Sequence, residues 1–151
     1  MSDTSILAPA AKRPWHLWAV GVISLLWNAF GGYDYVMTKT SGEAYLRGMG
    51  FNDAQVSHFL GYPGWMTAVW AVGVWGAVLG SVLLLFGSRF AFHAFVASLA
   101  GLLVSMVYTF GLSGGGALFG TMQLVMNVVI ALVCLLLVVY SRAMVKRGVL
   151  R

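Results

Sequence analysis

Long runs of hydrophobic residues, separated by short polar or glycine-rich stretches, fill most of the 151-residue chain. A membrane-spanning α-helix needs about 20 mostly apolar residues, because each residue advances the helix by about 1.5 Å across about 30 Å of hydrocarbon. Four runs reach this length, and they predict spans over residues 15–37, 63–86, 90–110 and 117–140. We therefore predict an all-α, polytopic membrane protein built as a four-transmembrane-helix bundle.

The connections between these runs are short, with one exception. Residues 87–89 alone separate the second and third runs, so these helices should form an antiparallel hairpin. A Ser-Gly-Gly-Gly turn within residues 112–116 precedes the fourth run. The exception is the external segment over residues 38–62, between the first two spans.

The external segment has a local helix signal. Asn52 or Asp53 is suited to capping a short helix that runs through Leu60. An apolar side made of residues such as Phe51 and Val56 would place this helix on the membrane surface or over the bundle mouth. A plain connector is the alternative.

Composition supports the membrane class, since 60% of the residues are hydrophobic and 9% are charged. A soluble domain usually carries about 25% charged residues, and one of this size has too little interior to hide so much apolar surface. We expect one transmembrane domain over residues 15–141, an N-terminal tail over residues 1–14 and a basic tail over residues 142–151.

The basic residues predict the orientation of the spans. The net charge is +5, and the Lys and Arg side chains lie near the ends of the apolar runs. If the N-terminus is cytoplasmic, Lys39 and Arg47 lie outside, and the cytoplasmic side holds Lys12, Arg13, Arg89, Arg142, Lys146, Arg147 and Arg151. This bias follows the positive-inside rule and predicts cytoplasmic termini. The basic side chains are therefore expected to contact anionic lipid headgroups, and no nucleic acid partner is expected.

Polar side chains within the spans are the main candidates for a site. In hydrocarbon each of them needs a hydrogen-bonding partner or a water-filled cavity. A polar site or solute path opening to the outside is one interpretation, and hydrogen bonding between helices is the other. The six candidates are Asn28, Asp34, Tyr35, Tyr108, Gln123 and Asn127. Spacing predicts that the polar face of the first span meets that of the fourth.

Small residues form a second pattern, in the second and third runs. Small side chains let helix backbones approach closely inside a membrane, where dispersion drives packing. Packing within the hairpin is the first interpretation, and a dimer or partner surface is the alternative. The helix-packing candidates are Gly73, Gly76, Gly80, Ala94, Ser98 and Gly101.

Motifs for catalysis or cofactors are weak in this sequence. His16 and His93 lie near the cytoplasmic ends of two spans, where a histidine pair can ligate haem or lie beside a quinone. Two interfacial, hydrogen-bonded histidines are the alternative, and we expect no cofactor. Cys134 is the single cysteine, and the sequence has neither a metal-ligand spacing nor a nucleophile motif. The sequence therefore predicts a protein that is not an enzyme.

Two blocks of sequence carry a family resemblance. They are Pro14-Trp15-His16-Leu17-Trp18 and Leu26-Trp27-Asn28-Ala29-Phe30-Gly31-Gly32-Tyr33-Asp34-Tyr35. Pro63-Gly64-Trp65 and Tyr140-Ser141-Arg142-Ala143-Met144 fit the same pattern. The chain resembles a family of small proteobacterial integral membrane proteins, some of which carry the label "sugar transporter". The resemblance implies a multi-pass protein of the bacterial inner membrane, and it implies no catalytic or binding residues.

Two functions remain open at this point. The first is an accessory or structural subunit of a larger membrane complex, or a self-associating scaffold. The second is a small oligomeric permease for a neutral or weakly polar solute such as a sugar. The spans supply many aromatic side chains but few polar ones, which favours the first function. The expected partners are the lipid bilayer and either a larger membrane protein complex or further copies of the chain.

Overall fold

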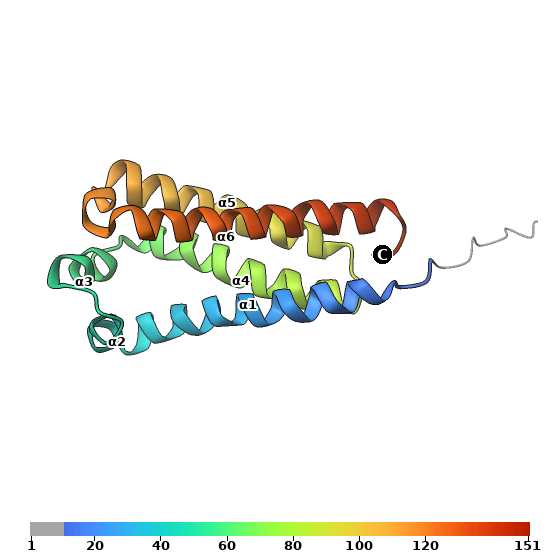
Figure 1. Cartoon of the computed structure of the whole chain (residues 1–151), viewed down its shortest axis with the longest axis horizontal. Helices are drawn as coiled ribbons and strands as arrows, with labels where there is room; N and C mark the ends of the chain where they lie inside the picture. Colours follow the sequence, from blue (N-terminus) through green and yellow to red (C-terminus); the bar gives the residue numbers. More distant parts are fainter. Residues whose placement is uncertain (1–10) are drawn as a thin grey trace, which may run out of the picture.

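The computed structural model describes residues 11–151, and all of its regular structure is helical (Figure 1). Four long helices lie side by side, and two short helices sit across one end of them. The elements are α1 (Trp15–Thr40), α2 (Gly42–Gly48), α3 (Asp53–Leu60), α4 (Gly64–Phe86), α5 (Phe90–Met106), the π-helical η1 (Val107–Leu112) and α6 (Gly115–Lys146). The N-terminal tail expected over residues 1–14 lies mostly outside this description.

Three of the helices are long and apolar enough to cross a membrane. They are α4, α5 continued by η1, and α6, with lengths of 23, 23 and 32 residues. Helix α1 has 26 residues, which is long enough, but its mean hydropathy is lower than that of the other three. The structure thus establishes an all-helical protein with three helices compatible with a membrane.

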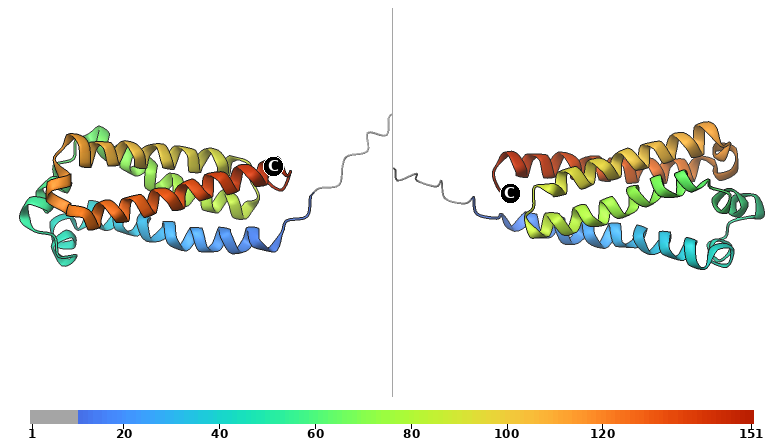
Figure 2. Two further views of the ribbon diagram at one scale, coloured as in Figure 1. Left: turned by 45° about the horizontal axis from the view of Figure 1, so that its top comes forward. Right: turned by 180° about the vertical axis from the view of Figure 1, so that it is seen from behind.

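The long helices pack in chain order as an open row. Helix α1 packs on α4, α4 packs on α5, and α5 packs on α6 (Figure 2). We call the end with α2 and α3 the capped end, and the opposite end, where α1 begins and α6 finishes, the terminal end. Helices α1 and α6 approach each other only at the terminal end, so the expected bundle is open between its first and last helices over the rest of their length.

The interface between α4 and α5 is built on small residues. A Cβ atom added at Gly76 would lie 3.2 Å from the Ala94 carbonyl oxygen, and one added at Gly101 would lie 2.9 Å from the Gly73 nitrogen. The Ser98 hydroxyl donates a hydrogen bond to the Gly73 carbonyl. The small-residue stripes therefore pack within the chain, where they bring the two backbones into close contact.

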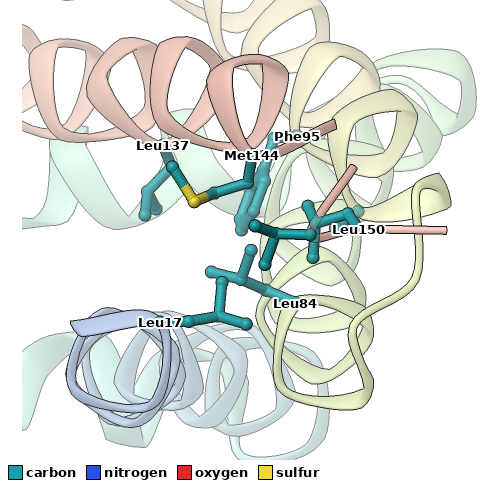
Figure 3. Packing of buried hydrophobic residues seen from close by; sticks show 8 residues of the cluster. Leu17, Leu84, Phe95, Leu137, Met144 and Leu150 are labelled. Carbon is teal, nitrogen blue, oxygen red and sulfur yellow. The ribbon is translucent and has the colours of Figure 1, made fainter. Parts of the chain in front are cut away.

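The main hydrophobic core lies at the terminal end and draws on all four long helices. Leu17 of α1, Leu84 of α4, Phe95 of α5 and Leu137 of α6 are buried against one another (Figure 3). Leu150, which follows α6, is also part of this core and is only 2% exposed. The terminal end is therefore where α1 and α6 converge.

Residues 147–151, which we call the strap, fold back over the terminal end. Gly148 has φ 68°, a left-handed conformation that turns the chain after α6. The Arg151 N–H donates to the Gly87 carbonyl at 2.9 Å, and the Arg89 N–H donates to the Arg151 carbonyl at 3.0 Å. The segment expected as a basic tail thus consists of the last turns of α6 and a strap held on the core.

The two short helices close the capped end. Of the two caps considered from sequence, α3 uses Asn52, whose side chain accepts from the Gln55 N–H at 3.0 Å. The Gln55 side chain accepts in return from the Asn52 N–H at 3.0 Å, which completes a capping box. The Gln55 amide also donates to the Leu118 carbonyl at 2.9 Å, so α3 is joined to the start of α6.

Candidate functional site

Asn28 is used inside the interface between α1 and α4. Its amide donates to the Ser81 hydroxyl at 2.9 Å and to the Ala77 carbonyl at 3.3 Å. Gly21 and Gly32, on the same face of α1, also lie against side chains of α4. The polar face of α1 is therefore directed at α4 instead of meeting the polar face of α6.

Gln123 and Asn127 occupy α6 without a partner on another helix. The Asn127 amide donates to the Gln123 carbonyl at 2.9 Å, one turn earlier in the same helix. Within residues 11–151 the Gln123 side chain makes no hydrogen bond. Both side chains are half-buried, and their spacing puts them on the same face as the buried Cys134.

A third polar group lies at the same depth on α5. The Cys134 thiol contacts the Ser98 hydroxyl at 3.8 Å, and α5 and α6 run in opposite directions. One heptad from this contact toward the capped end, Ser105 and Asn127 are therefore at matching depth. The Ser105 hydroxyl is buried and has no hydrogen-bond partner among the described residues. Unused hydrogen-bonding groups thus gather along the α5–α6 seam.

Asp34 and Tyr35 lie where α1 approaches the capped end. The Tyr45 hydroxyl donates to an Asp34 carboxylate oxygen at 3.0 Å. Burial, together with the neighbouring Asp34 carboxylate, raises the pKa of Tyr45 to about 12, so this phenol stays protonated and able to donate. The Tyr35 ring lies 4.7 Å from the Trp70 ring. Both candidates therefore hold α1 to neighbouring elements.

A polar and aromatic group at the capped end was not anticipated from sequence. The hydroxyl groups of Tyr62 and Thr109 lie 3.0 Å apart, and the Ser113 hydroxyl lies 3.3 Å from His58 Nε2. The His58 ring packs edge-on against Phe119, with ring centroids 5.3 Å apart. Burial lowers the pKa of His58, so the neutral imidazole is favoured there. We call His58, Tyr62, Thr109, Ser113 and Phe119 the capped-end cluster.

Tyr108 enters the capped end through its ring. Its ring centroid lies 5.8 Å from that of Tyr62 and 5.3 Å from that of Trp65, both nearly edge-on. No hydrogen bond of its hydroxyl occurs among the described residues. Sequence spacing could not find the cluster, because its members come from α3, η1, α6 and the connections that follow α3 and η1.

Two interruptions of regular α-helix coincide at the capped end. Helix α5 passes into the π-helical η1, and α6 is broken at Gly120, where φ is 67° and ψ is −174°. Only glycine adopts this conformation readily. Such interruptions often occur at functional sites, because they release backbone groups from the regular helical pattern. The capped end is therefore the part of the row with the most polar groups and the least regular backbone.

The two histidines near the terminal end have different surroundings. His16 Nδ1 lies 2.6 Å from the Tyr140 hydroxyl, which joins α1 to α6. His93 is exposed on α5, and its ring contacts those of Phe90 and Phe92. No contact joins the two imidazoles within residues 11–151, and that range contains no cluster of three potential metal-ligating side chains. The geometry therefore gives no support to a haem held between them.

A charged group joins α2 to α3 on the surface of the capped end. Arg47 pairs with Glu43 at 2.7 Å and also with Asp53. The three side chains are largely exposed, and exposed ion pairs contribute about 0–1 kcal/mol each. The group orients the two short helices without forming an enclosed site.

Comparison with known proteins yields no relative from which a function can be transferred. No protein-family model, curated protein or solved structure matches the chain. The resemblance to small proteobacterial membrane proteins therefore stays a prediction from sequence, and functional inference depends on the geometry described above.

Proposed function

We propose that the chain is a non-enzymatic integral membrane protein that works by helix association. It is either an accessory subunit of a larger membrane assembly or a self-associating scaffold. The observation that carries this proposal is the open row, in which α1 and α6 meet only at the terminal end and do not pack on each other over the rest of their length. A row open between its first and last helices leaves two helix edges available to other transmembrane segments.

Helix α1 is proposed as a fourth membrane span. It is antiparallel to α4 and packs along it. The amide of Asn28 donates its hydrogen bonds to residues of α4. The opposite face of α1 is apolar and exposed, with Ile23, Leu26 and Phe30 each between 67% and 71% exposed. In water this face would be costly, at about 25 cal/mol per Å² of apolar area, whereas lipid solvates it.

The proposed setting is the bacterial inner membrane, with the terminal end on the cytoplasmic side. The support is the positive-inside distribution of basic residues. Lys12, Arg13, Arg142, Lys146 and Arg147 all belong to the terminal end, whereas Lys39 and Arg47 belong to the capped end. Both termini would then be cytoplasmic, and α2 and α3 would face the periplasm.

Purification from the native membrane in a mild detergent tests this proposal. The eluted proteins are identified, and the mass of the intact particle is measured. A stoichiometric larger partner, or a homo-oligomer, is the expected result. Recovery of the 16.2 kDa chain only as a monomer, with no other protein bound to it, would contradict the proposal.

A second candidate function, a small oligomeric permease, is favoured by the capped end. In support of it, the capped-end cluster, Gln123 and Asn127 form a series of polar groups from the capped end toward the middle of the row. Discontinuous helices of this kind surround solute sites in many transporters. Substitution Q123L should then abolish uptake of the solute while leaving assembly intact. Unchanged uptake in that variant would count against transport through this seam.

A further inference from the structure

Three arginines from separate parts of the chain meet at the turn between α4 and α5, at the terminal end (Figure 1). Arg13, which precedes α1, donates from its guanidinium to the Phe86 carbonyl at 2.9 Å. Arg89 lies in the turn itself, and its N–H donates to the carbonyl of Arg151, in the strap, at 3.0 Å. All three residues are exposed. We call Arg13, Arg89 and Arg151 the arginine cluster.

The arginine cluster has no acidic partner within residues 11–151. No ion pair in that range involves any of the three guanidinium groups. The acidic side chains of the same range all belong to the capped end, and they are Asp34, Glu43 and Asp53. The positive charge of the cluster is therefore not neutralised by this part of the chain, and an anion from outside the chain would complement it.

The guanidinium groups also keep most of their hydrogen-bond donors. Each guanidinium carries five N–H donors in a planar fork. The side chains of Arg13 and Arg151 each donate to one backbone carbonyl, and no hydrogen bond within residues 11–151 uses the side chain of Arg89. A planar fork of donors matches the oxygens of a phosphate group, to which it can donate two parallel hydrogen bonds.

The place of the turn in the fold indicates where such a phosphate would come from. Helices α4 and α5 are both long and apolar enough to cross a membrane, and only residues 87–89 join them. An inserted hairpin therefore puts the turn at a membrane surface, at the level of the lipid headgroups. Beside the cluster, Trp15, Phe86 and Phe90 are 80%, 73% and 57% exposed. A lipid would find apolar rings for its acyl chains there, next to donors for its headgroup.

We propose that the arginine cluster is a binding site for the headgroup of one anionic phospholipid. The lipid phosphate accepts hydrogen bonds from the three guanidinium groups, and the acyl chains lie against the exposed rings beside the turn. One bound headgroup thereby joins the segment before α1, the α4–α5 turn and the strap. The site is more specific than the general attraction of basic residues to a membrane surface, because it selects three of the basic residues at the terminal end. It goes beyond the proposed function and does not depend on which side of the membrane the terminal end faces.

The first experiment is native mass spectrometry of the full chain in a neutral detergent, titrated with phosphatidylglycerol or with uncharged-headgroup phosphatidylcholine. The chain should bind one phosphatidylglycerol in preference to phosphatidylcholine. The R89Q variant should bind phosphatidylglycerol about fivefold more weakly, which is the effect of one basic residue at an anionic surface. Equal binding of the two lipids would overturn the proposal.

Arg142 provides the matched control for this titration. It is also exposed, but it belongs to α6 and takes no part in the hydrogen bonds at the turn. R142Q removes the same charge from the terminal end and should bind phosphatidylglycerol as the unaltered chain does. Circular dichroism verifies that R89Q and R142Q keep their helix content, which is expected because the Arg89 side chain makes no hydrogen bond within residues 11–151. Equal affinities of R89Q and R142Q would overturn the site.

Thermal unfolding in the same detergent identifies the occupant. A ligand that binds only the folded state raises the unfolding midpoint. Phosphatidylglycerol should raise the midpoint of the unaltered chain and of R142Q, and should raise that of R13Q/R89Q much less. Inorganic phosphate at the same concentration should not raise it, because it lacks the acyl chains that contact the rings. An equal rise with inorganic phosphate, or an equal rise in R13Q/R89Q, would overturn the proposed lipid site.

Discussion

At the scale of single residues, the structure assigns different work to residues that look alike in sequence. Asn28 and Asn127 are both amides near the middle of a span. The first is bonded across helices to α4, whereas the second is bonded only within α6. Sequence spacing places each residue on a helical face, but the neighbour opposite that face depends on the packing order of the helices.

Leu150 provides a test of the strap at this scale. Replacing this 2%-exposed side chain by alanine should reduce the free energy of unfolding by about 2–5 kcal/mol, through lost burial and a cavity in the terminal-end core. Leu136 is 68% exposed on α6, and L136A should change stability by no more than about 0.5 kcal/mol. Unfolding in mixed detergent micelles measures both. Equal effects would show that the strap is not packed on the core.

Gly101 provides a second test, at the α4–α5 interface. A side chain there would lie 2.9 Å from backbone atoms of both Gly73 and Val69, and neither can move without shifting α4. G101V should therefore destabilise the protein by about 1–3 kcal/mol or more. Gly111 has open space around its Cβ position, so G111V serves as the control and should cost much less. Similar midpoints of thermal unfolding for the two variants would contradict this close packing.

At the scale of elements, the sequence predicted where most helices lie, but it did not predict where those helices become irregular. The hairpin of α4 and α5 follows from two apolar runs joined by three residues, and the α3 cap follows from Asn52. Neither the π-helical η1 nor the break at Gly120 can be recognised from the spacing of hydrophobic residues in the sequence. Both depend on tertiary contacts at the capped end, which a hydrophobic pattern does not contain.

The strap was missed for a related reason. Residues 142–151 look like a basic tail, because Arg and Lys alternate with small and aliphatic residues. The fold separates them, leaving Arg142, Lys146 and Arg147 exposed while Val149 and Leu150 enter the core. The α4–α5 turn hydrogen bonds to Arg151 and so helps to hold this arrangement, and the position of that turn cannot be read from residues 142–151 alone.

The attachment of α3 should depend on pH through His58. Burial lowers its pKa in the folded state, so the unfolded state binds more protons between that lowered pKa and the unfolded value of about 6.5. The capped end should therefore have its full stability, as far as His58 affects it, above about pH 6.5. That stability should fall as the pH decreases from about 6.5 through the lowered pKa of His58. Hydrogen exchange of α3 amides measures it, and H58Q should remove the dependence. An α3 protection that is constant from pH 7 to pH 5 would contradict this account.

At the scale of the whole molecule, the account depends on a row of four helices with its two ends on opposite sides of a membrane. Three apolar helices are established, and α1 is proposed as the fourth span. Composition predicted a membrane protein, and the three apolar helices are compatible with one, but the sequence did not predict whether the bundle is closed. The order of packing decides it, and that order leaves α1 and α6 apart along most of their length.

Cysteine labelling tests the proposed topology in a C134S background. Ser57 is exposed at the capped end, whereas Lys12 and Arg147 are exposed at the terminal end. A membrane-impermeant thiol reagent should modify S57C in cells with only the outer membrane permeabilised. It should modify K12C and R147C only after the inner membrane is opened. Labelling of K12C together with S57C would show that α1 does not cross the membrane.

The central claim is that this chain works in association with other transmembrane helices. Native mass spectrometry of particles released directly from the source membrane tests this most directly, because no partner has to be chosen in advance. The account predicts a defined assembly, either two or more copies of the 16.2 kDa chain or the chain bound stoichiometrically to a larger membrane protein. Release of the chain only as a 16.2 kDa monomer, with lipid alone bound to it, would contradict the account.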